Sequence, residues 1–309
     1  MRFLSYMWKG TRSFGVALDG HLILDLPSAL REAAGHAPST LDEALKSWDP
    51  FLETVRTALD VFEERPEAVN PSFLVPPDGL KIDAPLRHPS KIVAVGLNYM
   101  DHCREQKVEA PAIPLLFTKF PSAIIGPGDT IRWNERISSQ VDFEAELGVV
   151  IGRRARRVPA GRALDFVAGY TALNDVSARD VQFGDKQWVR GKSFDTFCPM
   201  GPALVTADEI PDPHRLAIRC FVNGRAYQDS STAEMIFNVP RLIEFITQGI
   251  TLEPGDVIAT GTPDGVGVFR KPPLFLRDGD EVIVSIEKIG ELTNRVETSD
   301  EELWSTQAK

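Results

Sequence analysis

Acidic residues alternate with apolar ones in the segment QVDFEAELGVVIG, residues 140–152. Because successive side chains of a β-strand point to opposite faces, the pattern predicts that Asp142, Glu144 and Glu146 share one face. Like charges at that spacing repel when solvent does not screen them, whereas Mg²⁺, Mn²⁺ or Ca²⁺ prefers carboxylate oxygen ligands. The segment is a candidate metal site, although a solvated acidic face is the simpler interpretation when it is taken alone.

A third acid stands further along the chain in ALNDVSARDVQFGDKQW. A helix that begins at Asp175 would place Asp175, Arg179 and Gln182 on one face, at positions i, i+4 and i+7. That face would offer a carboxylate, a guanidinium and an amide to one site. By itself, the pattern also fits an N-cap aspartate followed by an ordinary i,i+4 ion pair.

A histidine and a glutamate lie one helical turn apart in GLNYMDHCREQ. His102 and Glu105 would be i,i+3 neighbours, so that the carboxylate could orient an imidazole that acts as a general base. Surface His–Glu pairs are common, so this segment alone is weak evidence for catalysis.

Two further segments supply polar groups. Lys192 in RGKSFDTFCPMGP precedes an apolar stretch, and a partly buried ammonium there would need an anionic partner such as a substrate carboxylate. Glycines 261, 265 and 267 flank Thr262 in IATGTPDGVG and would permit close approach of the backbone to a ligand. The phosphate-binding patterns GxxxxGK[ST] and GxGxxG are both absent from the sequence.

Charge and composition narrow the classes of partner. The net charge of −10 opposes the electrostatic attraction on which nucleic-acid binding depends, so we expect no nucleic-acid partner. A small anionic substrate would need a local positive centre, which a bound cation could provide. No apolar run reaches the roughly 18 residues of a membrane span, and the N-terminus lacks a signal-peptide pattern. Three widely spaced cysteines argue against a disulfide framework, and we expect a cytoplasmic protein.

The elements that must position these residues suggest an α+β fold. Residues 2–25 alternate like a small antiparallel unit with a turn at Asp19–Gly20, and Thr40 with Glu43 forms a capping-box pattern ahead of two short helices. Six prolines between residues 66 and 89 indicate a connector, which divides residues 1–80 from residues 81–309. The larger part is rich in strands, with helices expected over residues 99–107, 175–189 and 237–248.

The five segments that carry these candidate residues, taken in their order along the chain, resemble the signature of the fumarylacetoacetate hydrolase superfamily over roughly residues 90–290. The resemblance implies a mixed β-sandwich roll preceded by a small N-terminal α/β domain, and a homodimer. It also implies Mg²⁺ or Mn²⁺ as cofactor, with Ca²⁺ as a further candidate. The metal ligands would be Glu144, Glu146 and Asp175.

The resemblance assigns roles to the other candidates as well. His102 and Glu105 would form a water-activating dyad on a mobile lid, and Lys192 would stabilise the reacting oxyanion. The substrate, a small oxo acid, would be bound by Arg179, Gln182 and Thr262.

The family chemistry leaves several reactions open. We rank first the hydrolysis of a C–C bond in an acylpyruvate-type (2,4-dioxo) acid through a metal-stabilised enolate. Isomerisation of 2-hydroxyhepta-2,4-diene-1,7-dioate or decarboxylation of an oxo acid in aromatic catabolism is second, and ureidoglycolate or sugar-acid lyase chemistry is third. A cation-dependent binding protein without turnover is the non-enzyme alternative, but it would need neither the His102–Glu105 pair nor Lys192.

Overall fold

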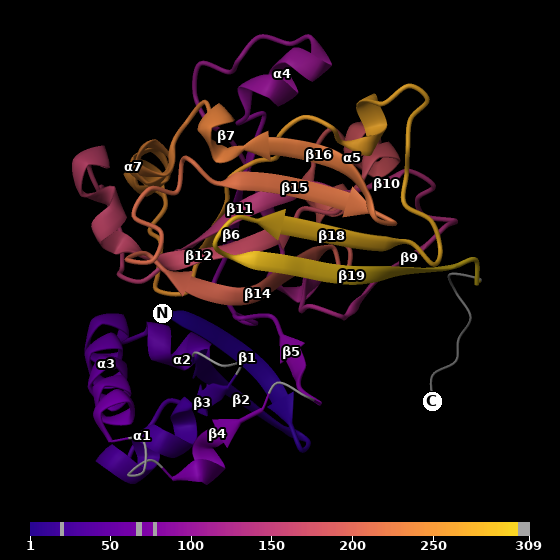
Figure 1. Cartoon of the computed structure of the whole chain (residues 1–309). Helices are drawn as coiled ribbons and strands as arrows, with labels where there is room; N and C mark the ends of the chain where they lie inside the picture. Colours follow the sequence, from indigo (N-terminus) through magenta and orange to yellow (C-terminus); the bar gives the residue numbers. More distant parts are fainter. Residues whose placement is uncertain (19–21, 66–69, 77–78, 302–309) are drawn as a thin grey trace.

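The structure, a computed structural model, describes residues 1–18, 22–65, 70–76 and 79–301 (Figure 1). The turn predicted at Asp19–Gly20 lies outside the described residues. The alternating N-terminal segment forms β1 (Arg2–Trp8), β2 (Thr11–Ala17) and β3 (Ile23–Asp25), which pair antiparallel as predicted. Lys9 and Gly10, both at positive φ, make the turn between β1 and β2.

Three helices accompany these strands, one more than the sequence pattern indicated. The additional helix α1 (Leu26–Ala34) starts where the Asp25 carboxylate accepts a hydrogen bond from the Ser28 amide. The predicted cap of α2 (Leu41–Leu45) is present, since the Thr40 hydroxyl accepts from the Glu43 amide at 3.2 Å. Helix α3 (Trp48–Glu64) is the longest of the three.

The N-terminal strands belong to the largest sheet of the protein. Its order is β4–β3–β2–β1–β14–β12–β11–β17–β6–β7, with β5 added on β1 and β8 on β14. The sheet is mixed, because β17 pairs with β6 in parallel while β11 pairs with β12 and β17 antiparallel. Besides β1–β3, its strands are β4 (Leu74–Val75), β5 (Lys81–Asp83), β6 (Ile92–Gly96), β7 (Leu115–Lys119), β8 (Ile124–Ile125), β11 (Ala145–Ile151), β12 (Val167–Asn174), β14 (Cys198–Thr206) and β17 (Val257–Ala259).

A second sheet has the order β16–β15–β18–β19–β9, and a two-stranded ladder joins β10 to β13. These strands are β9 (Thr130–Asn134), β10 (Val141–Asp142), β13 (Ser177–Ala178), β15 (Ala217–Val222), β16 (Arg225–Ser231), β18 (Glu281–Ile286) and β19 (Gly290–Ser299). Buried side chains of β11, β12, β15 and β18 belong to one apolar core between the two sheets. The fold is α+β, as predicted; the division between residues 80 and 81 stays a prediction.

The helices of the larger part lie around the sheets (Figure 1). They are α4 (Met100–Gln106), α5 (Arg179–Asp185), α6 (Val189–Lys192) and α7 (Val239–Gly249). Short 3₁₀ turns are η2 (Pro71–Phe73), η3 (Pro121–Ala123), η4 (Ala160–Phe166), η5 (Thr232–Glu234) and η6 (Gly267–Phe269). Among the helices described, none combines the length and apolar character that crossing a membrane requires.

Two predicted elements are wrong in their bounds. A helix over 175–189 does not form, because Ser177 and Ala178 pair with β10 and helical bonding begins only at Arg179. The strand predicted over 140–152 is interrupted at residues 143–144, since the Glu144 amide donates to the Asn174 side chain at 3.0 Å. The helices predicted over 99–107 and 237–248 are confirmed within a few residues.

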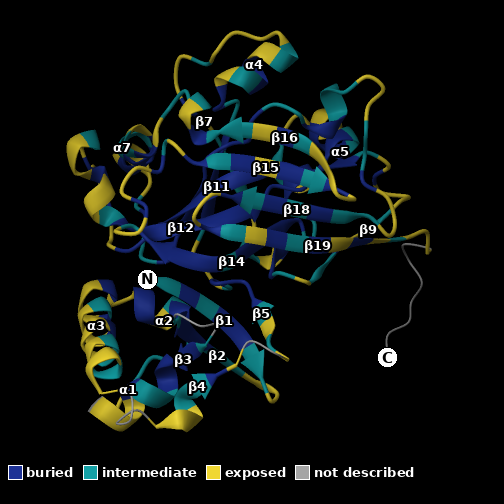
Figure 2. Cartoon of the chain, in the orientation of Figure 1, coloured by how far each residue is buried: buried dark blue, intermediate teal, exposed yellow. Residues whose placement is uncertain are grey.

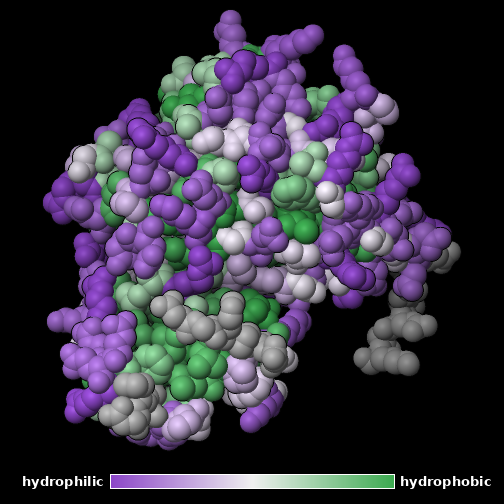
Figure 3. Space-filling view, viewed as in Figure 1, coloured by the Kyte–Doolittle hydropathy of each residue, from purple (hydrophilic) through white to green (hydrophobic). Residues whose placement is uncertain are grey.

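Most residues of the central strands are buried, whereas the outer faces of α1 and α3 are exposed (Figure 2). The visible face of the larger part is mostly hydrophilic, and apolar residues gather over the N-terminal strands (Figure 3).

A buried aromatic cluster joins β1 to α3. Phe3 of β1 is fully buried, and its ring lies 5.5 Å from that of Trp48 and 5.8 Å from that of Phe51. These aromatic contacts attach α3 to β1, and β1 in turn pairs with β14.

We predict that Phe3→Ala lowers the free energy of unfolding by about 3–5 kcal/mol, because it leaves a cavity between β1 and α3. Phe120→Ala, at a side chain 53% exposed, is the matched control and should change it by less than about 0.5 kcal/mol. Denaturant unfolding of both variants tests this. Equal effects of the two substitutions would show that the aromatic cluster does not stabilise the fold.

Candidate metal centre and active site

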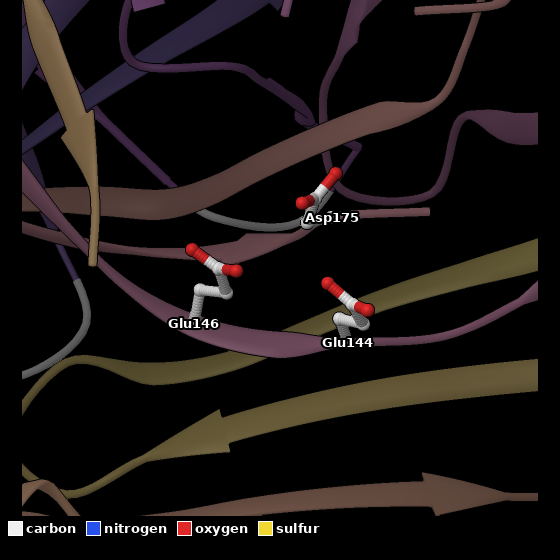
Figure 4. A group of neighbouring side chains, drawn as sticks. All are labelled: Glu144, Glu146 and Asp175. Atoms are coloured by element: carbon white, nitrogen blue, oxygen red, sulfur yellow. The ribbon is translucent and has the colours of Figure 1, made fainter. Parts of the chain in front are cut away.

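Three carboxylates meet where β11 begins and β12 ends. Glu144 directly precedes β11, Glu146 is the second residue of β11, and Asp175 directly follows β12. The antiparallel register places Ala145 opposite Asn174, so these two strand ends are neighbours. One carboxylate oxygen from each acid lies within 4.8 Å of the other two, and the three side chains converge in Figure 4. An ion with ligands at about 2.1–2.5 Å spans about 4–5 Å between two oxygens, so one cation can reach all three.

The chemistry of this group fits a hard divalent cation. All three acids are buried and offer oxygen only, which Mg²⁺, Mn²⁺ and Ca²⁺ prefer. Burial, followed by the charges of Asp175 and Glu144, raises the pKa of Glu146 well above its ordinary value. A bound cation would relieve this repulsion, so the residues present fit the predicted metal.

Two buried lysines contribute part of the compensating charge. The Lys192 ammonium donates to Glu144 Oε2 at 2.6 Å and to Asp175 Oδ2 at 2.7 Å. Burial alone would lower the pKa of Lys192, but the carboxylates of Asp175 and Glu144 raise it. The ammonium of Lys119, fully buried on β7, donates to Asp175 Oδ1 at 2.6 Å. Lys119 was missed in the sequence, where a lysine in the apolar strand LLFTK was the available signal.

Arg179 joins Glu144 to a second buried acid. Its Nη1 lies 2.7 Å from Glu144 Oε1 and donates to Gln182 Oε1 at 3.1 Å, while its Nε donates to Asp142 Oδ2 at 2.9 Å. Burial alone would raise the pKa of Glu144, but Lys192 and Arg179 lower it to about 2. The prediction that Asp142 shares a face with Glu144 and Glu146 is wrong. The strand breaks after β10, and Asp142 is not among the three acids whose oxygens converge; its carboxylate pairs with Arg179 and accepts from the Gly267 amide.

The predicted histidine–glutamate pair is formed on α4. His102 Nδ1 lies 3.0 Å from Glu105 Oε2, and the imidazole is buried. Glu105 Oε1 also accepts a hydrogen bond from the Gly265 amide at 3.0 Å, which attaches α4 to the loop after β17. The imidazole Nε2 lies 2.7 Å from the amide nitrogen of Gln106, a contact that the sequence pattern does not predict.

The glycine-rich loop after β17 holds three carboxylates by backbone amides. Gly261 donates to Glu146 Oε2 at 2.9 Å, Gly265 donates to Glu105, and Gly267 donates to Asp142 Oδ1 at 2.7 Å. Gly261 and Gly265 have φ values of +97° and +96°, a region that favours glycine. The sequence predicted that these glycines let the backbone approach a ligand closely. Within the described residues, the groups that approach the backbone are carboxylates of the protein itself.

Thr262 is positioned by a buried glutamine that the sequence analysis missed. The Gln228 amide nitrogen donates to Thr262 Oγ1 at 2.8 Å, and its oxygen accepts from the Ala145 amide at 2.9 Å. Gln228 is fully buried on β16 and thus ties the threonine to the start of β11. A glutamine within an exposed-looking hairpin strand gave no indication of this position.

A cavity of about 90 Å³ lies in front of these groups. Seven of the nine predicted site residues line it: His102, Glu144, Glu146, Arg179, Gln182, Lys192 and Thr262. The other two stand directly behind the lining, Glu105 on His102 and Asp175 on Lys192. Trp188, Phe117 and Phe269 supply apolar walls. The structure brings together all nine residues, while their individual roles remain predictions.

Comparison with known proteins gives the arrangement a context. Residues 91–297 match the family model described as fumarylacetoacetate (FAA) hydrolase C-terminal. The chain is 49% identical over 261 residues to a protein of Bos taurus named oxaloacetate tautomerase FAHD2A, mitochondrial. The aligned region covers 84% of this chain and 80% of that protein. The chain is 42% identical over 287 residues to the oxaloacetate tautomerase YisK of Bacillus subtilis, covering 91% and 95% respectively.

A solved structure agrees over nearly the whole chain. The fumarylacetoacetate hydrolase of Exiguobacterium antarcticum superposes with a TM-score of 0.82 at 36% identity, covering 96% of this chain and 99% of that one. The sheets and helices described above are therefore those of this fold. The chain belongs to the fumarylacetoacetate hydrolase family of enzymes.

Proposed function

We propose that the protein is a divalent-metal-dependent tautomerase that interconverts the keto and enol forms of a small 2-oxo dicarboxylate such as oxaloacetate. The observation that carries the proposal is the buried group of three carboxylates, two of which line a small cavity together with His102. The names of the two oxaloacetate tautomerases, at 49% and 42% identity, support this choice of reaction.

The size of the cavity favours a small acid. Its volume of about 90 Å³ is well below the roughly 300–1,000 Å³ of pockets for drug-sized ligands. Arg179, Lys192 and Thr262 place a guanidinium, an ammonium and a hydroxyl on its walls, and all three suit carboxylate or enolate oxygens. Together with a bound divalent cation, these groups would provide the local positive centre that a chain of net charge −10 needs for an anionic substrate.

The three acids Glu144, Glu146 and Asp175 would hold the cation, which supplies Lewis-acid stabilisation for a developing enolate. His102 would move the proton at the substrate's third carbon, because Glu105 accepts at Nδ1 and leaves Nε2 as the basic nitrogen. The Lys192 ammonium would donate to the oxygen on the second carbon, where negative charge develops. Arg179, Gln182 and Thr262 would orient the carboxylates. We propose Mg²⁺ or Mn²⁺ as the ion, with Ca²⁺ as a further candidate.

A second candidate is the hydrolysis of a C–C bond in an acylpyruvate, ranked first from the sequence. The His102–Glu105 pair favours it, since the same nitrogen could take a proton from water. The solved relative named a fumarylacetoacetate hydrolase has the same fold. Tautomerisation ranks above hydrolysis because the more similar relatives carry that name and because the small cavity leaves little room for an acyl chain and a water. Isomerase, decarboxylase and lyase activities rank lower.

We further propose a cytoplasmic homodimer without a nucleic-acid partner. Curated relatives are named as mitochondrial in Bos taurus, and a bacterial one is also known, so a cytoplasmic location stays a prediction. The homodimer and the absence of a nucleic-acid partner likewise remain predictions from the resemblance and the charge.

We predict that the metal-loaded protein accelerates the loss of the oxaloacetate enol, followed by its ultraviolet absorbance, and that chelation abolishes the effect. Acetylpyruvate and a hydroxydienoate should react with a lower kcat/KM. A higher kcat/KM for acetylpyruvate cleavage would instead support the hydrolase. Activity on none of these acids by protein with bound metal would contradict the proposal.

We predict that Glu146→Gln lowers affinity for Mg²⁺ and Mn²⁺ by more than about 100-fold, because it removes a charged ligand. The metal-free variant should unfold at the same temperature as the metal-free wild type or above it. The reason is that burial and two neighbouring carboxylates oppose ionisation of Glu146 in the folded state. Calorimetric titration and thermal unfolding measure both effects. Glu109→Gln, at an exposed residue, is the matched control, and a metal-induced stabilisation equal in both variants would exclude this site.

We predict that His102→Ala keeps its affinity for the metal while kcat for enol loss falls by about 10²–10⁴-fold, the usual contribution of a general base. Glu105→Gln should give a smaller loss, because the imidazole remains but its orientation is weakened. Stopped-flow kinetics and calorimetric titration on the same preparations separate turnover from metal binding. Unchanged turnover in His102→Ala would refute the dyad.

A further inference from the structure

The side-chain amide of Gln106 contacts Nε2 of His102, the nitrogen that would act as the base. The Gln106 Nε2 lies 2.7 Å from His102 Nε2, and Gln106 is the last residue of α4, one helical turn after the histidine. Gln106 also lines the cavity that His102 faces. Gln106 is thus a polar side chain of the site to which the proposed reaction assigns no role.

The two contacts of the imidazole define one protonation pattern. The Glu105 carboxylate at 3.0 Å accepts a hydrogen bond, so Nδ1 carries the proton. Nε2 then has the lone pair, and the amide N–H of Gln106 donates into it. A lone pair that accepts this hydrogen bond is not free to take a proton from substrate. The described conformation is therefore a resting one, and the amide must leave Nε2 before His102 can act.

The displaced amide stays at the cavity wall. Gln106 is partly exposed and has a flexible side chain, whereas His102 is buried and is held by Glu105. Lys192 and Arg179 line the same cavity and contact Glu144, a carboxylate of the metal centre. A substrate whose oxo-acid end lies there would direct its far end toward α4, where the Gln106 amide can donate to an oxygen.

We propose that Gln106 is a substrate-responsive residue that donates to His102 Nε2 in the free enzyme and to the distal carboxylate of a diacid in the complex. It fixes the tautomer of the base before substrate arrives, and its release couples recognition of the second carboxylate to activation of His102. This inference rests on the proposed function. It adds that the site selects dicarboxylates over monocarboxylates of the same chain length.

The test compares Gln106→Met with the wild type in the full-length, Mg²⁺-loaded protein. Methionine keeps the length of the side chain but has no N–H to donate. Gln248→Met, at an exposed position of α7, is the matched control. Proton exchange at the third carbon of oxaloacetate and of 2-oxobutanoate is followed in deuterated water by NMR. For oxaloacetate, kcat/KM should fall about 10-fold or more in Gln106→Met, mainly through KM, because a hydrogen bond to a charged group is lost.

For 2-oxobutanoate the same substitution should leave kcat/KM unchanged or raise it, because this substrate has no second carboxylate and the base is no longer covered. An equal fall for both acids would overturn the proposed selectivity. If Gln106→Met matches Gln248→Met on both substrates while His102→Ala loses turnover, the role of Gln106 fails and the proposed function stands. If the wild type exchanges neither acid, both fail.

A second measurement does not depend on turnover. In protein labelled with ¹⁵N at histidine, the Nε2 resonance of His102 reports the hydrogen bond that this nitrogen accepts. We expect the resonance to move in Gln106→Met, and to move in the same sense when oxaloacetate binds to the wild type. An Nε2 resonance that is identical in Gln106→Met and Gln248→Met would overturn the contact on which the proposal depends.

Discussion

The structure depends on the balance of buried charge around Asp175 and Glu144. Isolated ions are costly to remove from water, so a buried carboxylate must be paired, protonated or bound to metal. Four buried acids face three buried cations here; the acids are Asp142, Glu144, Glu146 and Asp175, and the cations are Lys119, Lys192 and Arg179. One negative charge is left in excess. Burial and the charges of Asp175 and Glu144 raise the pKa of Glu146, so the metal-free site disfavours the charge on this acid.

This imbalance distinguishes a functional site from a structural ion-pair network. A network that served stability alone would gain from an equal number of opposite charges, or from apolar replacements. An arrangement that keeps one carboxylate short of a partner is suited to a cation that arrives with its own charge. The same cation would reverse the sign of the local field and admit an anionic substrate to an acidic protein.

The loop after β17 connects the metal centre to α4. Its backbone amides bind Glu146 at one point, Glu105 at another and Asp142 at a third. Thr262 lies in the same loop and is held by Gln228 from the second sheet. A displacement of this loop would therefore disturb the ligand Glu146 and the orientation of His102 together. Glycine is needed at position 267, because a Cβ atom added there would lie 1.9 Å from the Leu274 carbonyl oxygen and collide with it.

The sequence by itself determined the α+β class, because hydrophobic periodicity is a local property. Ligand chemistry made the nine site residues candidates, and the resemblance to one family assigned them to a single site. Spacing could identify Glu144 and Glu146 as neighbours, and the order of motifs resembled one family. Tertiary structure alone decided that Asp142 belongs to Arg179 and that Asp175 precedes a short strand pair instead of opening a helix. It also decided that Lys119, Gln228 and Gln106 reach the site. These outcomes depend on contacts between segments distant in the chain or on side-chain direction, which the pattern of residues along one segment does not contain.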